Sequence, residues 1–491
     1  MKRIISLALC FLLVFTLCQS VLAAGENVCE INGIGHPTLN GALTTVQNGE
    51  TIRLLKDIDY AAGIVIEDKS ITFDLNGYTL NVVNNAEADT IEEMSGLYVK
   101  GNAAVALEGE GEFNVTGAWF GVFAECDSGE TASATVTNAT GIGRFGVIAQ
   151  RSKVTVGGDV TSNGSSGYGY NYGGVFASYN AEVTVEGDVY ANGETSVGVY
   201  SDEFALVTVK GNIVVNDYNS RGIEAYDKGK VIVEKDITAS GTGSIGIYSM
   251  SSNVTVGGNV TGDYGGIYAF RSDIDITGDV QTLGFLVNNY GVTATKFSHI
   301  YVAGDVRSNE SGAVIWTEDN ETPSQIIIGG VIEAPKYVQI GIKTLDFTDG
   351  FHTTSIEGGC YLVYEDPDNP DIGVVGVAEF AGGSGIMGDP YLVAHADQLY
   401  NVRNHLDKHF RQTRDINLSG YSTGEGWAPI GTSAVPFTGS FDGDGHTIGN
   451  LFISRGTSDY VGLFGYIGKT AEIRNLGLEN AGTTGKNFVG S

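Results

Sequence analysis

The chain of 491 residues carries a formal net charge of −31, and 42% of its residues are hydrophobic while only 8 are proline. This composition excludes a disordered or collagen-like chain, and the 71 glycines favour a bend-rich β fold. The negative charge excludes nucleic acid and anionic lipid surfaces as partners, because like charges repel.

The first 23 residues form a secretory signal. Lys2 and Arg3 precede a nearly continuous apolar run, and Val21-Leu22-Ala23 supplies a small-residue cleavage pattern. The apolar run is too short to span a bilayer. The sequence therefore predicts a secreted chain that begins near Ala24, is extracellular and is not inserted into a membrane.

Residues 24–95 are predicted to form an N-terminal cap. Within them, Ser70 to Gly77 reads as a strand followed by a turn. The end of a stack of strands exposes unpaired edges and an open core, so another segment has to cover it.

Residues 96–345 are organised by a four-residue unit: glycine, an aliphatic residue, any residue, and a small or aliphatic residue. Ten copies recur at a mean spacing of 24 residues. Self-similarity at this period marks a stacked architecture in which each repeat packs only against its neighbours. The copies begin at Gly96, Gly121, Gly146, Gly174, Gly198, Gly222, Gly246, Gly266, Gly284 and Gly312.

A second unit runs in phase with the first and alternates β-branched residues, as expected of strands whose side chains point to opposite faces. Each period therefore holds about three short strands separated by tight bends, which predicts an all-β, right-handed parallel β-helix with turns of about 24 residues. Clear copies of the second unit are Val154-Thr155-Val156, Val183-Thr184-Val185, Val207-Thr208-Val209, Val231-Ile232-Val233 and Val254-Thr255-Val256.

An acidic or amide residue follows each copy of the second unit and is expected to stack with its counterparts at one bend. Asn and Asp tolerate left-handed backbone and hydrogen-bond locally, so a structural ladder is favoured over a string of metal ions. The series is Asp159, Asp188, Asn212, Asp236 and Asn259.

The pattern changes after the β-helix. Residues 346–390 lose the period and gather prolines and glycines, so they are expected to form an irregular linker. Residues 391–491 are predicted to be a separate β-rich module with one amphipathic helix, Asp397 to Phe410. Its apolar positions are Leu399, Val402, Leu406 and Phe410.

Several motifs of this module resemble those of the GLUG-motif family of bacterial surface proteins, over residues 385–491. The resemblance implies a bacterial extracellular protein, and the stop at Ser491 in mid-motif suggests a truncated chain. Upstream, the period and pattern resemble the pectin-lyase-like β-helix superfamily. The motifs are Gly388-Asp389-Pro390-Tyr391-Leu392, Trp427-Ala428-Pro429-Ile430-Gly431, Phe441-Asp442-Gly443-Asp444-Gly445-His446 and Gly462-Leu463-Phe464-Gly465.

Carbohydrate-cleaving β-helices need two or three convergent carboxylates, or a carboxylate beside a basic residue. The best local cluster lies one turn apart in the 24-residue register, with Arg221 and Lys228 beside it. In a chain with 58 acidic residues, such a cluster also arises by chance. The candidate catalytic residues, if the chain is an enzyme, are Asp202, Glu203, Glu224 and Asp227.

Two further patterns suggest metals only weakly. His405 and His409 have the helical spacing of a zinc pair, but no third ligand is evident and Leu406 stands where a metalloprotease needs Glu. Asp442-Gly443-Asp444-Gly445 begins like a calcium loop and then lacks the remaining ligands. We therefore expect no cofactor, with calcium at this turn as the alternative.

The mature chain keeps Cys29, Cys126 and Cys360, an odd and widely spaced set that cannot form a disulfide framework. The pairing state of these cysteines stays open.

The third position of the glycine unit forms a column that is expected to point outward from the β-helix. Aromatic rings on an exposed face can stack on sugar rings, and Tyr adds a hydrogen-bonding group. The alternative is that neighbouring turns stack these side chains for stability. The candidate ligand-binding residues are Tyr98, Phe123, Phe176, Tyr200, Tyr248 and Tyr268; Ile148 and Glu224 complete the column.

The sequence favours a secreted, non-enzymatic surface protein, an adhesin or stalk that contacts glycans or host and other extracellular molecules. The alternatives are a polysaccharide lyase or glycoside hydrolase of the β-helix class and a spacer without a binding function.

Overall fold

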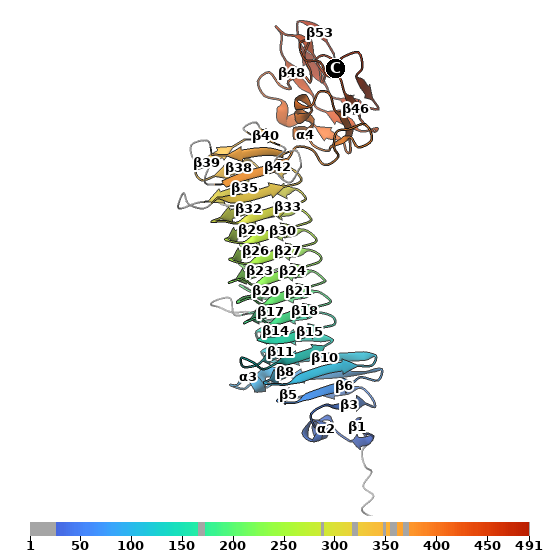
Figure 1. Cartoon of the computed structure of the whole chain (residues 1–491), viewed down its shortest axis with the longest axis vertical. Coiled ribbons are helices and arrows are strands. Elements are labelled where there is room, and N and C mark those ends of the chain that lie inside the picture. Colours follow the sequence, from blue (N-terminus) through green and yellow to red (C-terminus); the bar gives the residue numbers. More distant parts are fainter. Residues whose placement is uncertain are drawn as a thin grey trace, which may run out of the picture. The chain divides into compact units, whose positions relative to one another are not determined.

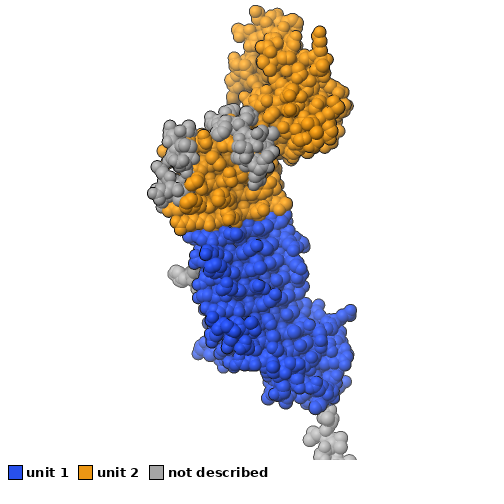
Figure 2. Space-filling view, in the orientation of Figure 1, with its two compact units in different colours: residues 1–263 blue, residues 264–491 orange. Residues whose placement is uncertain are grey.

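The computed structural model describes residues 26–164, 172–285, 289–316, 323–346, 350–353, 361–366 and 373–490 (Figure 1). The expected signal segment and Cys360 lie outside these residues. The chain divides into two compact units, residues 1–263 and 264–491 (Figure 2). Among the described residues, every helix is too short or too polar to cross a membrane.

The first unit is a parallel β-helix, which confirms the predicted fold class (Figure 1). Each turn contributes one strand to each of three sheets, which we call A, B and C. The glycine unit forms sheet C, the β-branched triplets form sheet A, and the segment after the Asp or Asn forms sheet B. The register of the strand pairs confirms the repeat length of 24 residues, since Val199 pairs with Ile223 and Ile223 pairs with Ile247.

The strands of this unit follow in chain order. Sheet C holds β5 (Ile64–Glu67), β8 (Ser95–Lys100), β11 (Phe120–Glu125), β14 (Phe145–Gln150), β17 (Gly173–Ser178), β20 (Val197–Ser201), β23 (Arg221–Tyr226) and β26 (Ile245–Met250). Sheet A holds β3 (Glu50–Leu54), β6 (Ser70–Asp74), β9 (Ala104–Glu108), β12 (Ala132–Val136), β15 (Ser152–Val156), β18 (Glu182–Val185), β21 (Leu206–Val209), β24 (Lys230–Val233) and β27 (Asn253–Val256). Sheet B holds β4 (Ile58–Tyr60), β7 (Tyr78–Asn84), β10 (Gly111–Gly117), β13 (Asn138–Gly141), β16 (Val160–Ser162), β19 (Val189–Ala191), β22 (Ile213–Val215), β25 (Ile237–Ala239) and β28 (Val260–Gly262).

The repeated glycine is required by packing between sheets C and B. A Cβ atom added to Gly198 would overlap the Cγ2 of Ile213, and one added to Gly222 would overlap the Cγ2 of Ile237. The glycine of one sheet thus makes room for the branched side chain of the other. Because protein interiors are close-packed, the two positions have to be chosen together.

The N-terminal segment closes the stack and also starts it. β1 (Cys29–Ile31) pairs antiparallel with β2 (Ile34–His36) and with β3, and α2 (Leu39–Thr45) packs beside them. The turns begin at β3, earlier than the boundary expected at residue 96. Gly63-Ile64-Val65-Ile66 is a further copy of the glycine unit, 33 residues before Gly96, because β7 is long and α3 (Ile91–Met94) is inserted.

The N-terminal end of the second unit is also a parallel β-helix with three sheets, and its strands are given the same letters. Gly291, rather than the expected Gly284, occupies the glycine position, since its neighbour Val292 pairs with Ile267 and Ala313. The sheet C strands are β29 (Gly265–Phe270), β32 (Tyr290–Thr295), β35 (Ser311–Trp316), β38 (Lys336–Ile340) and β39 (Lys343–Leu345). The others are β30 (Asp273–Ile276), β33 (His299–Val302) and β36 (Ser324–Ile328) in sheet A, and β31 (Val280–Thr282), β34 (Val306–Arg307) and β37 (Ile332–Glu333) in sheet B.

The segment expected to be an irregular linker contributes strands to sheet A. β42 (Gly373–Ala378) pairs parallel with β36, and β41 (Tyr361–Glu365) pairs antiparallel with β42 and with β40 (Phe351–Thr353).

The C-terminal module is a second, wider parallel β-helix. His409, Ser440 and Glu472 occupy equivalent positions, so its turns span 31 and 32 residues. Its core is rich in aromatic rings and centres on the fully buried Trp427. The strands are β43 (Tyr391–Val393), β44 (His409–Gln412), β45 (Ile416–Asn417), β46 (Ser440–Asp442), β47 (Thr447–Gly449), β48 (Phe452–Ser454), β49 (Asp459–Val461), β50 (Glu472–Arg474), β51 (Gly477–Glu479), β52 (Gly482–Thr484) and β53 (Asn487–Val489).

The predicted helix of this module is shorter than expected. α4 covers Ala396–Asn401, a 3-10 turn covers Val402–Asn404, and Phe410 lies in β44. Helix prediction over residues 397–410 was therefore wrong beyond residue 401, because Phe410 pairs with Phe441 of β46 and sheet pairing overrides the local period.

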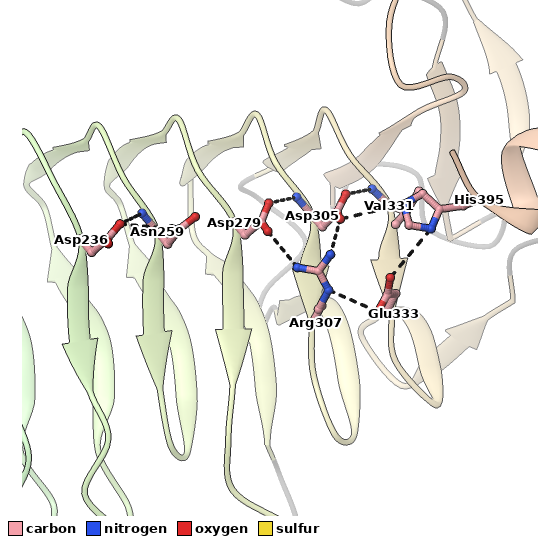
Figure 3. A network of polar contacts seen from close by, with 8 residues as sticks. All are labelled: Asp236, Asn259, Asp279, Asp305, Arg307, Val331, Glu333 and His395. Carbon is pink, nitrogen blue, oxygen red and sulfur yellow. Dashed lines mark hydrogen bonds and ion pairs between the residues drawn. The ribbon is translucent and has the colours of Figure 1, made fainter. Parts of the chain in front are cut away.

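Polar ladders join successive turns. The carboxylate Oδ1 of Asp188 accepts hydrogen bonds from the backbone N–H of Asn212 at 2.6 Å and from its side-chain amide at 3.0 Å. The backbone N–H of Asp188 donates in turn to Asp159 at 2.8 Å. This confirms the predicted stacking and gives the ladder a structural role; Figure 3 shows Asp236 and Asn259 in the same arrangement.

Candidate functional site

The outward column of sheet C is the first candidate site. Register places Tyr98, Phe123, Ile148, Phe176, Tyr200, Glu224 and Tyr248 side by side on consecutive strands. Tyr268 has the same position in β29, where it pairs with Thr293. The sequence-predicted column therefore exists in the first unit, and its period comes directly from the glycine unit.

The two ends of this column differ in burial. Tyr98 and Phe123 are only 4% exposed, because they pack with Phe120 and Phe145, which precede the repeated glycines. The expectation that Tyr98 and Phe123 are exposed to solvent is therefore wrong. Further along, Tyr200 and Tyr248 are partly exposed.

Neighbouring aromatic rings in the column pack against one another. Phe176 and Tyr200 stack with centroids 4.8 Å apart and planes 7° apart, and Tyr200 lies 5.6 Å from Tyr226. Such pairs stabilise beyond the area they bury. A ligand at this surface would therefore meet ring edges and hydroxyl groups more than open ring faces.

A buried carboxylate interrupts the aromatic column. Glu224 is 2% exposed, and its Oε1 accepts short hydrogen bonds from the Arg221 guanidinium and the Tyr226 hydroxyl. Its Oε2 is buried and has no hydrogen-bond partner among the described residues. Burial raises the pKa of Glu224, and Arg221 and Tyr226 only partly offset this effect.

The other predicted carboxylates lie beside this centre. Asp202 accepts hydrogen bonds from the backbone N–H of Glu203 at 2.8 Å and from the Tyr200 hydroxyl at 3.4 Å. Burial, and then the charge of Asp227, raise the pKa of Asp202. The structure thus brings Asp202, Glu224 and Asp227 into one neighbourhood, as the 24-residue register predicted, with Asp227 exposed.

The two histidines expected to share a helix face do not share a ligand site. His405 follows the 3-10 turn, and its Nε2 lies 2.9 Å from Glu379. His409 lies in β44, and its Nδ1 lies 2.7 Å from the Ser440 hydroxyl. Their zinc spacing is lost because the helix ends before either residue.

Asp442 is engaged in a turn rather than set out as a calcium ligand. Its Oδ2 accepts hydrogen bonds from Arg474 at 2.8 and 2.9 Å, and its Oδ1 accepts from the Asp444 backbone and the Asn475 side chain, both at 3.0 Å. Hydrogen bonds within the turn thus occupy both carboxylate oxygens of Asp442.

Two cysteines are described, and both are free and buried. Burial raises the pKa of the Cys29 thiol to about 11, so it stays protonated and unreactive at neutral pH.

A cavity of about 430 Å³ in the second unit was not predicted from the sequence. Its lining combines aromatic side chains with a glycine-rich backbone, and Gly382, Gly383 and Ser384 of the segment expected to be a linker form part of the wall. The aromatic lining residues are Tyr301, Tyr361, Phe380 and Tyr391.

Comparison with known proteins gives partial matches. The chain is 42% identical over 122 residues to a putative Gly-rich membrane protein of Evansella cellulosilytica, over 24% of this chain and 14% of that protein. It is 39% identical over 116 residues to halomucin of Haloquadratum walsbyi, over 22% of this chain and 1% of that protein. The matches thus span a small part of each relative. No family model and no solved structure matches the chain.

Proposed function

We propose that this chain is a non-enzymatic, extracellular surface protein whose β-helix presents the sheet C column to glycans or other extracellular partners. The observation that carries the proposal is the partly exposed stretch of that column around Tyr200 and Tyr248. The hydroxyl groups of Tyr200 and Tyr226 and the carboxylate of Asp202 lie together there and are partly exposed. Such groups can hydrogen-bond to saccharide hydroxyls while the ring edges supply apolar contact.

Two further observations support a surface location. One relative is described as a membrane protein, and the other is named halomucin. The secretory pattern of the first 23 residues and the GLUG-like motifs of residues 385–491 point the same way.

The experiment compares two triple variants at Tyr200, Tyr248 and Tyr268 on a glycan array and on whole bacterial cells. Replacement by Ser removes rings and hydroxyls, whereas replacement by Phe keeps the stacked rings. We expect the Ser variant to lose binding by at least ten-fold, and the Phe variant to lose part of it. Tyr218→Ser is the control, because this ring is 58% exposed outside the column.

Melting temperatures separate the outcomes. The Ser variant is expected to lose about 0.5–1.5 kcal/mol of stability, because Tyr200 stacks on Phe176. Binding that is equal in all variants would show that the sheet C column is not the binding surface, and an array without any wild-type binding would contradict glycan recognition.

The second candidate function is a polysaccharide lyase or glycoside hydrolase. It is favoured by the raised pKa values of Glu224 and Asp202 next to Arg221, since active sites combine perturbed carboxylates with a basic group. The burial of Glu224 opposes it, because an acid or base has to reach its substrate. Release of unsaturated or reducing ends from pectin, alginate, glucan or glycosaminoglycan, abolished by Asp202→Ala or Asp227→Ala, would establish the enzyme.

A further inference from the structure

A cluster of two carboxylates and a histidine joins the β-helix turns of the second unit to its C-terminal module (Figure 3). Asp305 stands at the bend before β34, and Glu333 ends β37. His395 is the residue before α4 and is 18% exposed. The three side chains come from segments up to 90 residues apart, so no local motif marks them.

The imidazole of His395 faces both carboxylates at distances that are too long for hydrogen bonds. Its Nε2 lies 4.0 Å from Asp305 Oδ2, and its Nδ1 lies 3.9 Å from Glu333 Oε1. Neither ring nitrogen has a hydrogen-bond partner among the described residues. Ligand atoms from all three side chains lie within 4.8 Å of one another.

We propose that Asp305, Glu333 and His395 bind a divalent transition-metal ion of the Zn²⁺ type. Two ligands about 2.1 Å from a tetrahedral zinc ion lie about 3.4 Å apart, and one ligand atom from each of the three residues lies within 4.8 Å of the others, so shifts of up to about 1.4 Å bring them into place. One ring nitrogen coordinates the ion, and water completes its shell. The ion fastens the start of α4 to two successive β-helix turns.

Arg307 orients the two carboxylates, and at Asp305 it contacts Oδ2, the oxygen that also faces His395. Its Nε donates to Glu333 Oε2 at 3.2 Å, its Nη2 donates to Asp305, and its Nη1 donates to Asp279 at 2.8 Å. Glu333 Oε1 stays available for the ion. Hydrogen bonds of this outer kind commonly fix carboxylate ligands.

The charge balance leaves room for a cation. Asp279, Asp305 and Glu333 supply three negative charges, while Arg307 and the nearby Arg414 supply two positive charges.

The test is calorimetric titration of the tag-free, metal-stripped full chain with zinc chloride at pH 7.5. We expect one saturable equivalent per chain, and at least ten-fold weaker binding for His395→Gln and for Glu333→Gln. His299→Gln is the matched control, because His299 pairs with Asp273 at 3.0 Å on the exposed surface of the same unit. This control should bind zinc as the wild type does.

Two further measurements make the result decisive. Zinc should raise the melting temperature of the wild type and of His299→Gln but not that of His395→Gln, because an ion that binds only the folded state stabilises it. Cobalt should give a visible absorption band that needs His395. Absence of saturable binding, or equal binding by the folded His395→Gln variant, would overturn the proposal. Loss of stability in that variant without any zinc effect would leave only ion pairing.

Discussion

At the scale of single residues, Glu224 depends on Arg221. The two side chains are 2% and 14% exposed, so their charges are poorly screened by water. Removing one partner of such a pair leaves a buried charge, which is more costly than losing an exposed ion pair.

Arg221→Met is therefore expected to lower stability by about 3 kcal/mol at pH 7. The raised pKa of Glu224 favours its neutral form in the folded state, so its contribution is favourable below the ordinary glutamate pKa and is lost as pH rises through the higher folded value. The loss caused by Arg221→Met should thus shrink at acidic pH. Urea unfolding at pH 7 and pH 4.5 measures it. Lys230→Met, at an exposed position of the neighbouring strand β24, should change stability by less than about 0.5 kcal/mol.

Asp188 shows the opposite pH dependence. Burial alone would raise the pKa of its carboxyl, but hydrogen bonds from Asn212 and Tyr190 outweigh burial and lower it. Asp188→Ala should cost about 1–2 kcal/mol at pH 7, and Asp188→Asn should cost less, because Asn already occupies this ladder elsewhere.

Because a lowered pKa stabilises the ionised form, the contribution of Asp188 is present above the ordinary aspartate pKa and is lost as pH falls through the lower folded value. The difference between the wild type and Asp188→Ala should therefore narrow in unfolding experiments at pH 3. A difference that widens in acid would contradict this account.

At the scale of elements, the glycine position of sheet C distinguishes two kinds of glycine. Gly198→Ala places a methyl group against Ile213 and should cost about 1–3 kcal/mol through overpacking. Gly157→Ala is the control, because its Cβ would meet nothing nearer than a backbone oxygen at 3.7 Å. Chemical unfolding compares the two variants. Ile213→Ala removes the Cγ2 atom that the new methyl group would overlap, so the combination of Gly198→Ala with Ile213→Ala should cost less than the sum of the two single variants. Strictly additive losses would argue against this packing.

The elements also show what the sequence could predict. Strands of sheets A and C follow from alternation and from the glycine unit, since both patterns are local. The sequence did not reveal the copy of the glycine unit at Gly63, because α3 stretches its spacing to 33 residues. The prediction of helix beyond Asn401 was wrong, because Phe410 fits both the helical spacing of apolar residues and the alternation of a strand. The 24-residue register predicted that the carboxylates of the Asp202–Asp227 cluster lie close together. It did not predict the burial of Glu224, which depends on the side chains that pack around it. The proximity of His395 to Asp305 depends on how the chain folds between them, and no local sequence pattern predicts it.

At the scale of the whole molecule, the formal charge of −31 opposes folding through self-repulsion. Raising the salt concentration from 10 to 150 mM shortens the screening length to about 8 Å. We expect the melting temperature to rise by about 2 °C, roughly 1 kcal/mol for a chain of this size. Differential scanning calorimetry in sodium chloride measures the shift, and a fall in melting temperature would show that attractive ion pairs dominate instead.

The ladders that join successive turns have a consequence for how such a gene can change. Removing residues 198–221 would join Val197 to Gly222, so that every strand, bend and ladder residue would meet a neighbour of the same kind. Removing half as many residues would shift the sequence by half a turn, so that glycine positions of sheet C would fall at positions that belong to another sheet. Length changes within the strands are therefore tolerated in whole multiples of one turn, whereas the bends accept insertions such as α3. Recombination between copies can adjust the number of turns without disturbing the chemistry of any one of them.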